Sequence, residues 1–241
     1  MSARSSSAST TRERLAAGER LLGTFLNLGS PLAAEACARA GFDWLVFDLE
    51  HGAGTERELI PTIQAIAGRS AALVRVEEND RPRFARALDG GADGVMVPRV
   101  DSAEEAAQAI ACMRYPPRGV RGVAYMNRAA GWGYPRGDVD ALGVVQIESG
   151  AAVDDSGAIA AVDGVDVLFV GPNDLSAALQ TDDLPLAKVV EAADANGKTA
   201  GILARSREDA EHYVEQGFRF VGIGSDSLFL VQGARAAAGT A

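Results

Sequence analysis

The chain has 241 residues, enough for one large domain or two small ones. It is 47% hydrophobic and 23% charged, which is ordinary for a folded protein. Its formal net charge of −10 argues against nucleic acid and anionic membranes as partners, because both bind basic surfaces. No apolar run in the sequence reaches the roughly 18 residues that a membrane span needs.

The first residues differ in composition from the rest. Residues 1–14 are rich in Ser, Thr and Arg, and no apolar segment follows them, which argues against a standard secretory signal. We therefore expect a disordered tail over residues 1–14 and a single domain over residues 15–241. The cysteines, Cys37 and Cys112, have no CxxC neighbour and no histidine at zinc spacing, so we expect buried, reduced thiols in a cytoplasmic protein.

Strand and helix patterns alternate from residue 21 almost to the end of the chain. Short apolar, β-branched segments predict eight buried strands, at Leu21–Leu28, Trp44–Leu49, Ala72–Val76, Gly94–Val100, Gly143–Glu148, Val167–Val170, Thr199–Leu203 and Phe218–Ile223. Apolar residues at helical spacing predict helices between them, at Pro31–Ala40, Glu56–Ala67, Arg81–Leu88, Ala103–Met113 and Arg207–Gln216. Eight such units predict an α/β fold of the (β/α)8 TIM barrel type. A doubly wound open sheet is the alternative, but residues 27–31 lack its glycine-rich first turn.

The longest irregular stretch runs from Tyr115 to Leu142. Loops of that length in a compact domain are usually functional or disordered. Its arginine and aromatic content favours a functional loop.

The end of the second strand carries candidates for acid–base chemistry. In a parallel barrel the active site lies at the carboxyl ends of the strands. Asp48 and Glu50 share one side of this strand, and His51 opens the loop that follows it. Asp48 could hold one ring nitrogen of His51 and leave the other as a base. A loop histidine beside a structural carboxylate is the alternative.

Three further charged residues lie at the same predicted rim. Arg75, inside the third strand, must be paired, either in a structural salt bridge or with a substrate oxygen that becomes negative. Glu148 and Asp174 end or follow the fifth and sixth strands. Carboxylates raised on neighbouring strands repel unless a cation lies between them, and a hard divalent ion that keeps water ligands is the simplest candidate. Asp174 could instead cap the helix that begins near Leu175.

Combined, these segments resemble the metal-dependent class II pyruvate aldolases, the family of 4-hydroxy-2-oxoheptanedioate aldolase and 2-dehydro-3-deoxyglucarate aldolase. The matching strings are Gly41-Phe42-Asp43-Trp44, Asp48-Leu49-Glu50-His51-Gly52, Val74-Arg75, Tyr115-Pro116-Pro117-Arg118-Gly119-Val120-Arg121-Gly122, Val145-Gln146-Ile147-Glu148 and Val170-Gly171-Pro172-Asn173-Asp174-Leu175-Ser176. The resemblance covers nearly the whole chain after the tail. It implies a barrel of the phosphoenolpyruvate/pyruvate-domain type and the reversible retro-aldol cleavage of a 4-hydroxy-2-oxo acid to pyruvate and an aldehyde through an enolate.

The resemblance also implies roles for single residues. Glu148 and Asp174 match the ligands of a divalent metal (Mg2+, Mn2+ or Co2+), Arg75 matches an arginine on the keto oxygen, and His51, oriented by Asp48, matches the base. The substrate-binding positions are Phe25, Gln146, Asn173, Asp174, Ser176 and Leu203. Asp89 and Arg121 match positions placed near the site by a neighbouring subunit. The family typically forms a homo-oligomer, a hexamer or trimer of dimers, with exchanged C-terminal helices.

The chain departs from the family pattern in three places. Phe25 stands where members often have Trp, the loop over residues 125–142 looks shortened, and the helix after the sixth strand is expected to be stunted. These departures leave other reactions of the enolate open: oxaloacetate decarboxylation, or a citrate-synthase-like or cycloaddition-like condensation. A non-catalytic protein that binds an oxo acid is the alternative from another class. No lysine ends a strand at this rim, which argues against a Schiff-base aldolase.

Overall fold

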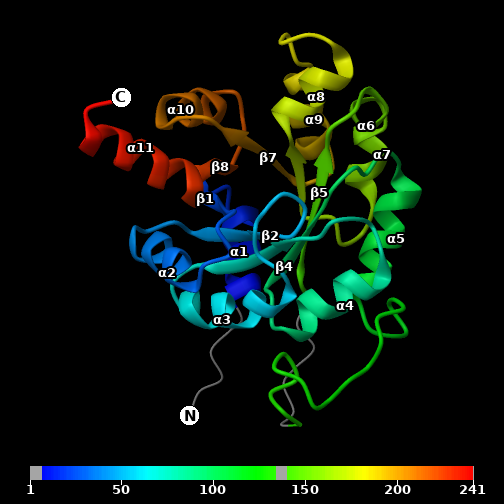
Figure 1. The fold of residues 1–241 in the computed structure, drawn as a ribbon. Coiled ribbons are helices and arrows are strands. Elements are labelled where there is room, and N and C mark those ends of the chain that lie inside the picture. Colours follow the sequence, from blue (N-terminus) through cyan, green and yellow to red (C-terminus); the bar gives the residue numbers. More distant parts are fainter. Residues whose placement is uncertain (1–6, 134–139, 241) are drawn as a thin grey trace.

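The computed structural model describes residues 7–133 and 140–240. Parallel strands hydrogen-bond in chain order, and β8 pairs with β1 to close a barrel with helices around it (Figure 1). The strands are β1 (Leu21–Leu26), β2 (Trp44–Asp48), β3 (Ala71–Arg75), β4 (Gly94–Val97), β5 (Leu142–Ile147), β6 (Val167–Val170), β7 (Thr199–Ala204) and β8 (Phe220–Ser225). The predicted TIM barrel is therefore confirmed. β4 ends before Pro98, earlier than predicted, and Arg99 then takes a left-handed backbone conformation with φ 53°.

The predicted helices are present as α2 (Pro31–Arg39), α3 (Glu56–Ile66), α4 (Arg81–Asp89), α5 (Ala103–Met113) and α10 (Arg207–Glu215). The structure adds α1 (Ser7–Ala16), α6 (Gly150–Asp154), α7 (Ser156–Ala161), α8 (Pro172–Leu179), α9 (Leu186–Ala195) and α11 (Asp226–Ala238). After β6 the chain forms α8, which is short as expected, and then the separate helix α9. Across the described ranges, no helix has the length and apolar character to cross a membrane.

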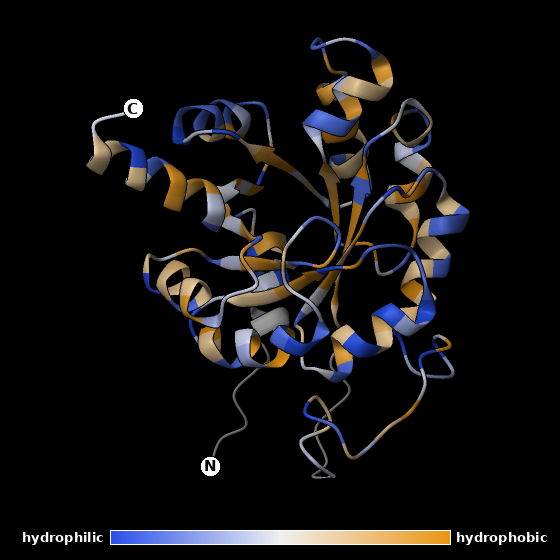
Figure 2. Ribbon diagram, in the orientation of Figure 1, coloured by the Kyte–Doolittle hydropathy of each residue, from blue (hydrophilic) through white to orange (hydrophobic). Residues whose placement is uncertain are grey.

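The apolar residues form two layers, one inside the barrel and one between the strands and the helices (Figure 2). Inside, Trp44 stacks on Phe220 with ring centroids 4.1 Å apart. Gly23 makes room for this pair, because a Cβ there would lie 2.0 Å from the Trp44 ring. The interior is thus a packed core rather than a pore. Cys37 and Cys112 are buried and free, as expected.

A repeated tripeptide organises the base of the barrel, the end where the strands begin. Gly-X-Asp precedes β2, β4 and β6, at residues 41–43, 91–93 and 164–166. Each aspartate accepts a hydrogen bond from a backbone amide of the preceding strand, at 2.8 to 2.9 Å. Each glycine has a φ between 95° and 100°, a conformation that other residues rarely adopt. The turn before β8 keeps the glycine but has Arg219 in place of the aspartate.

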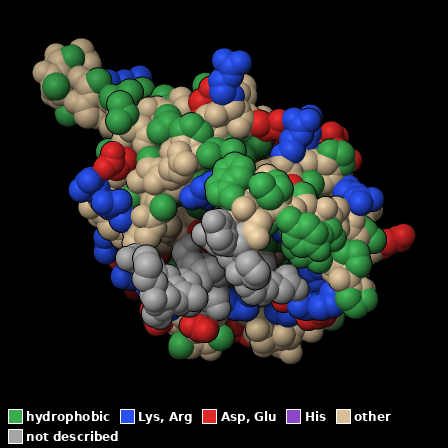
Figure 3. Space-filling view, turned by 90° about the horizontal axis from the view of Figure 1, so that it is seen from below, with side chains coloured by type: hydrophobic (Ala, Val, Ile, Leu, Met, Phe, Trp, Pro, Cys, Tyr) green, Lys and Arg blue, Asp and Glu red, His purple; other side chains and the backbone are tan. Residues whose placement is uncertain are grey.

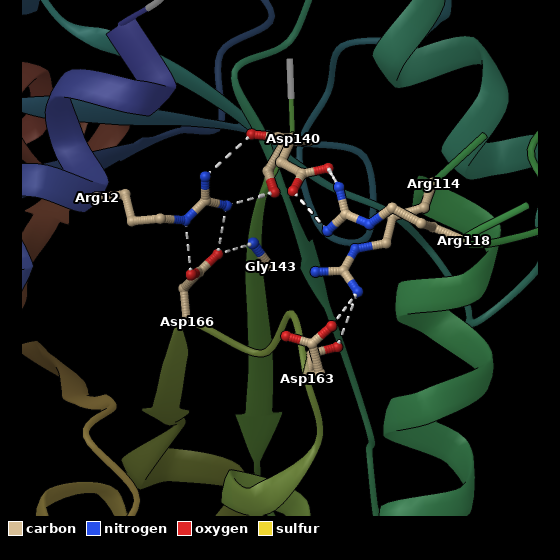
Figure 4. A network of polar contacts seen from close by, with 8 residues as sticks. Arg12, Arg114, Arg118, Asp140, Gly143, Asp163 and Asp166 are labelled. Atoms are coloured by element: carbon tan, nitrogen blue, oxygen red, sulfur yellow. Dashed lines mark hydrogen bonds and ion pairs between the residues drawn. The ribbon is translucent and has the colours of Figure 1, made fainter. Parts of the chain in front are cut away.

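Helix α1 lies against this base, so the expectation of a disordered tail over residues 1–14 is wrong from residue 7 onward; residues 1–6 lie outside the described residues. Arg12 donates from Nε and Nη2 to the two carboxylate oxygens of Asp166, at 2.8 and 2.9 Å (Figure 4). Arg14 pairs with Asp43 at 2.7 Å. Leu15 is buried against the interior cluster. Arg12 and Arg14, two of the arginines that suggested a tail, are therefore counterions for aspartates of the barrel.

The loop after α5 extends away from the barrel on the base side (Figure 1). Its exposed apolar residues include Val123, Tyr125, Met126 and Trp132. Seen from below, hydrophobic side chains gather in patches among polar and charged ones (Figure 3). Residues 134–139 of the loop predicted to be functional lie outside the described residues.

Candidate active site

The alternation of side chains along the strands carries the predicted site residues to the rim, the end where the strands stop. On β2, Trp44 and Val46 lie in the interior cluster, and Asp48 follows them on the same side. Arg75 follows Leu73 on β3 in the same way. On β5, Gln146 and then Glu148 follow Val144. The interior is therefore apolar at the base and polar at the rim.

Arg75 is held in a cage of two carboxylates and one ring. Its Nε and Nη2 donate to the two oxygens of Asp48, at 2.9 and 2.8 Å, and its Nη1 lies 3.1 Å from Glu50 Oε2. The guanidinium also lies over the Phe25 ring, 5.0 Å from its centroid. Because a guanidinium has five N–H donors and these contacts use three, two remain for a ligand. Arg75 can thus form structural salt bridges and still bind a substrate oxygen.

Asp48 does not hold the ring of His51, so that expectation is wrong. Its oxygens accept from Arg75, from Asn27 Nδ2 at 2.7 Å, and from the backbone amides of Glu50 and His51 at 3.1 and 3.2 Å. Burial opposes ionisation of Asp48, but the bonds from Arg75 and the amides outweigh it, so its pKa lies below the usual value. Asp48 positions Arg75 instead of the imidazole.

The His51 side chain is 61% exposed at the mouth of the barrel, and its Nε2 lies 3.8 Å from Glu50 Oε2. The nearest carboxylate to the ring is thus Glu50, which also contacts Arg75. Exposure leaves the imidazole accessible to a substrate that enters the mouth.

Glu148 is a buried carboxylate that lies close to other negative charges. Gln146 Nε2 donates to its Oε1, and the Arg99 amide donates to its Oε2 at 3.3 Å. Burial, and then the charges of Asp174 and Glu50, raise the pKa of Glu148 to about 7. A site that concentrates carboxylates without enough positive charge fits a bound cation.

The backbone at Gly171, which directly follows β6, lies close to Glu148, and this close contact also suits a ligand site. A Cβ on Gly171 would lie 2.6 Å from Glu148 Oε1, so only glycine leaves this carboxylate in place. Gly171 is the N-cap of α8, and Asp174 stands exposed in the first turn, where it makes no capping bond. The Oε1 atom of Gln146 is buried with no hydrogen-bond partner among the described residues.

In the described part of the chain, no three His, Cys, Asp or Glu side chains are arranged to hold a metal ion. Glu148 and Asp174, whose charges interact, are the two carboxylates predicted as ligands. Such a site suits an ion that keeps waters or takes its other ligands from the substrate.

Three other predicted pocket residues lie near this region with different surroundings. Asn173 Oδ1 accepts from Arg205 Nη2 at 3.3 Å. Leu203 packs against the interior cluster from β7. Ser176 donates instead to Asp182 at 2.9 Å, so the structure does not join it to the carboxylate pair.

A family model described as HpcH/HpaI aldolase/citrate lyase matches residues 21–232. The chain belongs to this family. The 5-keto-4-deoxy-D-glucarate aldolase of Enterobacter sp. (strain 638) is 43% identical over 226 residues, 88% of each chain. The structure of an HpcH/HpaI aldolase/citrate lyase family protein from Burkholderia cenocepacia J2315 is 37% identical, with a TM-score of 0.90 over 95% of this chain and 97% of that one. The HpcH/HpaI aldolase from Desulfitobacterium hafniense DCB-2 is 31% identical, with a TM-score of 0.85 over 94% and 95%. The chain is thus a carbon–carbon lyase of a family that generally depends on a divalent metal.

Two residues predicted to lie near the site of this aldolase are at the opposite end of the barrel. Asp89 ends α4 and pairs with Arg121 at 2.7 Å. The Arg121 guanidinium also lies 4.5 Å from the centroid of the Tyr115 ring. Both residues lie on the base side, so they do not reach the rim of their own barrel.

Sequence reasoning missed three residues of the aldolase site. Asn27 contacts Asp48, Arg99 contacts Glu148 through its backbone, and Arg205 contacts Asn173. All three follow the end of a strand, which is the position where a barrel enzyme places functional residues. That positional rule, applied to every strand, would have found them.

Proposed function

We propose that this aldolase uses a divalent metal to cleave 4-hydroxy-2-oxo acids reversibly into pyruvate and an aldehyde. The observation that carries the proposal is the set of carboxylates around Glu148, which lies beside Arg75 at the end of the barrel where chemistry takes place. The relative named for 5-keto-4-deoxy-D-glucarate supports an oxidised sugar acid as substrate.

Glu148 and Asp174 would hold the metal ion, which is Mg2+, Mn2+ or Co2+. When bound, the ion supplies positive charge beside the oxygen that becomes negative as the carbon–carbon bond breaks. The raised pKa of Glu148 and the narrow space at Gly171 support this assignment.

Arg75 donates to the keto oxygen of the pyruvate half. Two N–H groups remain available, because Asp48 accepts from Nε and Nη2 and Glu50 forms an ion pair with Nη1. A guanidinium fixed before the reaction stabilises the charge of the forming enolate without reorganising. Asp48 and Asn27 act as positioning residues, since they hold the guanidinium in place.

His51 removes the proton from the 4-hydroxyl group during cleavage and returns it to the aldehyde oxygen during condensation. Histidine is the side chain that most often acts as a base near neutral pH. The exposure of His51 at the mouth and its position beside Glu50 support this role. Replacing His51 with Ala is expected to lower kcat by about 100- to 10,000-fold. Turnover equal to wild type would exclude it as the base.

The pyruvate carboxylate binds at the start of α8. The amides of Asn173 and Asp174 lie in the first turn of this helix, where N–H groups lack partners within the helix. Phe25, Gln146 and Leu203 form the wall of the pocket. Ser176 stays a weaker candidate because it contacts Asp182.

A homo-oligomer in the cytoplasm completes the proposal. Helix α11 extends from the barrel (Figure 1), and Leu228, Leu230 and Val231 are exposed on it, which supports an interface between copies. Asp89 and Arg121 would reach the rim of a neighbouring barrel. Two buried, free cysteines support a reducing compartment. Light scattering tests the assembly: a hexamer, as a trimer of dimers, supports it, and a monomer contradicts it.

The proposed reaction is tested by solvent deuterium exchange into the methyl group of pyruvate, followed by proton NMR. Exchange that requires Mg2+ or Mn2+ and stops with a chelator is expected, because enolate formation does not need the aldehyde. Exchange that survives chelation would contradict metal dependence. No exchange by a folded, metal-loaded protein would contradict pyruvate as the enolate.

A further inference from the structure

The helix α11 is attached to the barrel through a charged residue. Its apolar side chains Leu228, Leu230 and Val231 are exposed, and the helix extends away from the barrel (Figure 1). Among the described residues of this helix only Asp226 is buried, with 5% of its surface exposed. A buried carboxylate costs free energy unless its partners offset the lost hydration. The partners of Asp226 therefore indicate what this side chain does.

Asp226 contacts the turn at the end of a neighbouring strand. It directly follows β8, and it accepts hydrogen bonds from the backbone amides of Asn27 and Leu28, which directly follow β1, at 2.7 and 3.3 Å. It also accepts from the Ser227 amide at 2.8 Å. Burial raises the pKa of Asp226, and the amides oppose this rise because they favour the charged form. The carboxylate thus fixes the turn after β1 through backbone amides.

Capping of α11 does not explain this arrangement. The cap of the helix is Ser225, whose Oγ accepts from the Leu228 amide at 3.2 Å. A carboxylate in the first turn also interacts favourably with the helix dipole, but that interaction does not require burial. Asp226 is buried and bonds to the neighbouring turn as well as to its own helix. Its contact with that turn is therefore a separate role.

Asn27 connects this turn to the arginine that faces the substrate. Its Nδ2 donates to Asp48 Oδ2 at 2.7 Å. Asp48 in turn accepts from Nε and Nη2 of Arg75, at 2.9 and 2.8 Å. Because Asp226 holds the Asn27 backbone, the side chain of Asn27 keeps its position beside Asp48. Three successive contacts thus link the start of α11 to the Arg75 guanidinium.

We propose that Asp226 is a positioning residue for the aldolase reaction, because it fixes the turn from which Asn27 supports Asp48. This inference rests on the proposed contact of Arg75 with the keto oxygen, and it adds a support for that contact from outside the pocket. A donor stabilises a developing charge best when it is fixed before the reaction, so a loosened support lowers the rate more than it weakens binding. The start of α11 thereby affects catalysis, although Asp226 acts only through other residues.

The test measures the exchange of pyruvate methyl protons at saturating Mn2+. Asp226→Ala should lower kcat by about 10- to 100-fold with little change in KM, because a misplaced guanidinium loses transition-state stabilisation. The dissociation constant for Mn2+ should stay at the wild-type value, because the hydrogen bonds of Asp226 are to amides of the β1 turn and of α11. Asp226→Asn keeps an oxygen for the Asn27 amide, so its kcat should fall only about threefold.

Ser225→Ala is the matched control on the same helix. It removes the cap of α11 but leaves the hydrogen bond between Asp226 and the Asn27 amide. The free energy of unfolding should fall, because a helix cap is lost. Exchange per folded molecule should stay at the wild-type rate. An equal fall of kcat in Ser225→Ala and Asp226→Ala would overturn the inference, because the effect would then come from the helix as a whole.

A double-variant cycle shows whether Asp226 acts through Asn27. Asn27→Ala should itself lower kcat by about tenfold, because a hydrogen bond to the charged Asp48 is lost. Adding Asp226→Ala should then cost much less than it does in wild type. If Asp226→Ala does not fold, the same cycle with Asp226→Asn decides.

Losses that multiply in the double variant, or an Asp226→Ala variant with the wild-type kcat, would overturn the inference. Wild type that fails to exchange pyruvate protons would instead contradict the proposed function.

Discussion

The two ends of the barrel differ in how their carboxylates are paired. At the base, Asp43 and Asp166 each accept a backbone amide and pair with an arginine of α1. At the rim, Glu148 is buried near Asp174 and Glu50, and burial and then the repulsion raise its pKa to about 7. Charges at the base are matched within the chain. At the rim Arg75 matches Asp48 and Glu50, but Glu148 and Asp174 have no ion-pair partner among the described residues. The comparison separates residues that hold the fold from residues that carry out the reaction.

The largest effect is expected from Glu148→Gln. Removing this carboxylate removes one of two protein ligands for the metal, so kcat/KM should fall by about 1,000-fold or more. The metal-free variant should nevertheless be more stable than wild type at pH 8, by about 1 kcal/mol, because a buried charge near other carboxylates is gone. Steady-state kinetics and urea unfolding measure the two changes. A variant that loses both activity and stability would show that Glu148 belongs with the residues of the base.

A smaller loss is expected from Gly171→Ala. The new Cβ would displace Glu148, whose Oε1 lies 2.6 Å from that position. The dissociation constant for Mn2+ should rise by about 10- to 100-fold, as for other changes around a metal ligand. Calorimetric titration measures it, with Gly157→Ala as control because a Cβ there meets nothing within 4 Å. Unchanged affinity in Gly171→Ala would indicate that Glu148 can move without loss.

At the base, Asp166→Asn should act on stability alone. It loses the ion pair with Arg12 and weakens the bond from the Gly143 amide, so the free energy of unfolding should fall by about 1–3 kcal/mol. Pyruvate exchange per folded molecule should stay at the wild-type rate. Asp163→Asn is the control, because Asp163 is 89% exposed and its pair with Arg114 should contribute about 1 kcal/mol or less. A loss of exchange in Asp166→Asn would show that the two ends are coupled.

The last prediction is a pH dependence of metal binding. Because the pKa of Glu148 is raised to about 7, protons compete with the metal below that pH, and the apparent dissociation constant for Mn2+ should rise by about tenfold per pH unit from pH 7 to pH 5. Low pH weakens metal binding, but in the metal-free protein it stabilises the folded state. The folded state holds this proton more tightly than the unfolded state, so the contribution of Glu148 to stability is present at low pH and is lost as pH rises through 7. An affinity for Mn2+ that is constant from pH 8 to pH 5 would contradict this behaviour.

The sequence predicted the barrel and most of the rim because both follow from short-range periodicity. Asp48, Arg75 and Glu148 continue the same alternation that puts Trp44, Leu73 and Val144 inside. Contacts between distant segments had no such signal. Asp48 binds Arg75 on the next strand rather than the nearby ring of His51, and a choice of partner across strands leaves no pattern in the sequence.

The error at the N-terminus has the same origin. Residues 1–14 have the composition of a solvated tail. Their composition does not reveal the contact of Arg12 with Asp166, which lies 154 positions away.

The Gly-X-Asp turns also say how this barrel can be taken apart. They recur before β2, β4 and β6, so three quarters of the barrel, each of two strands, begin with the same hydrogen bond to the strand before. The quarter that begins with β8 lacks this bond, because Arg219 replaces the aspartate. Cuts placed just before Gly41, Gly91 or Gly164 would keep each aspartate with the strand it introduces. If a quarter from a related aldolase were exchanged at these glycines, its aspartate could accept a hydrogen bond from the backbone amide of the strand before it. Shuffled libraries with these boundaries should therefore contain more folded members than libraries cut at the rim.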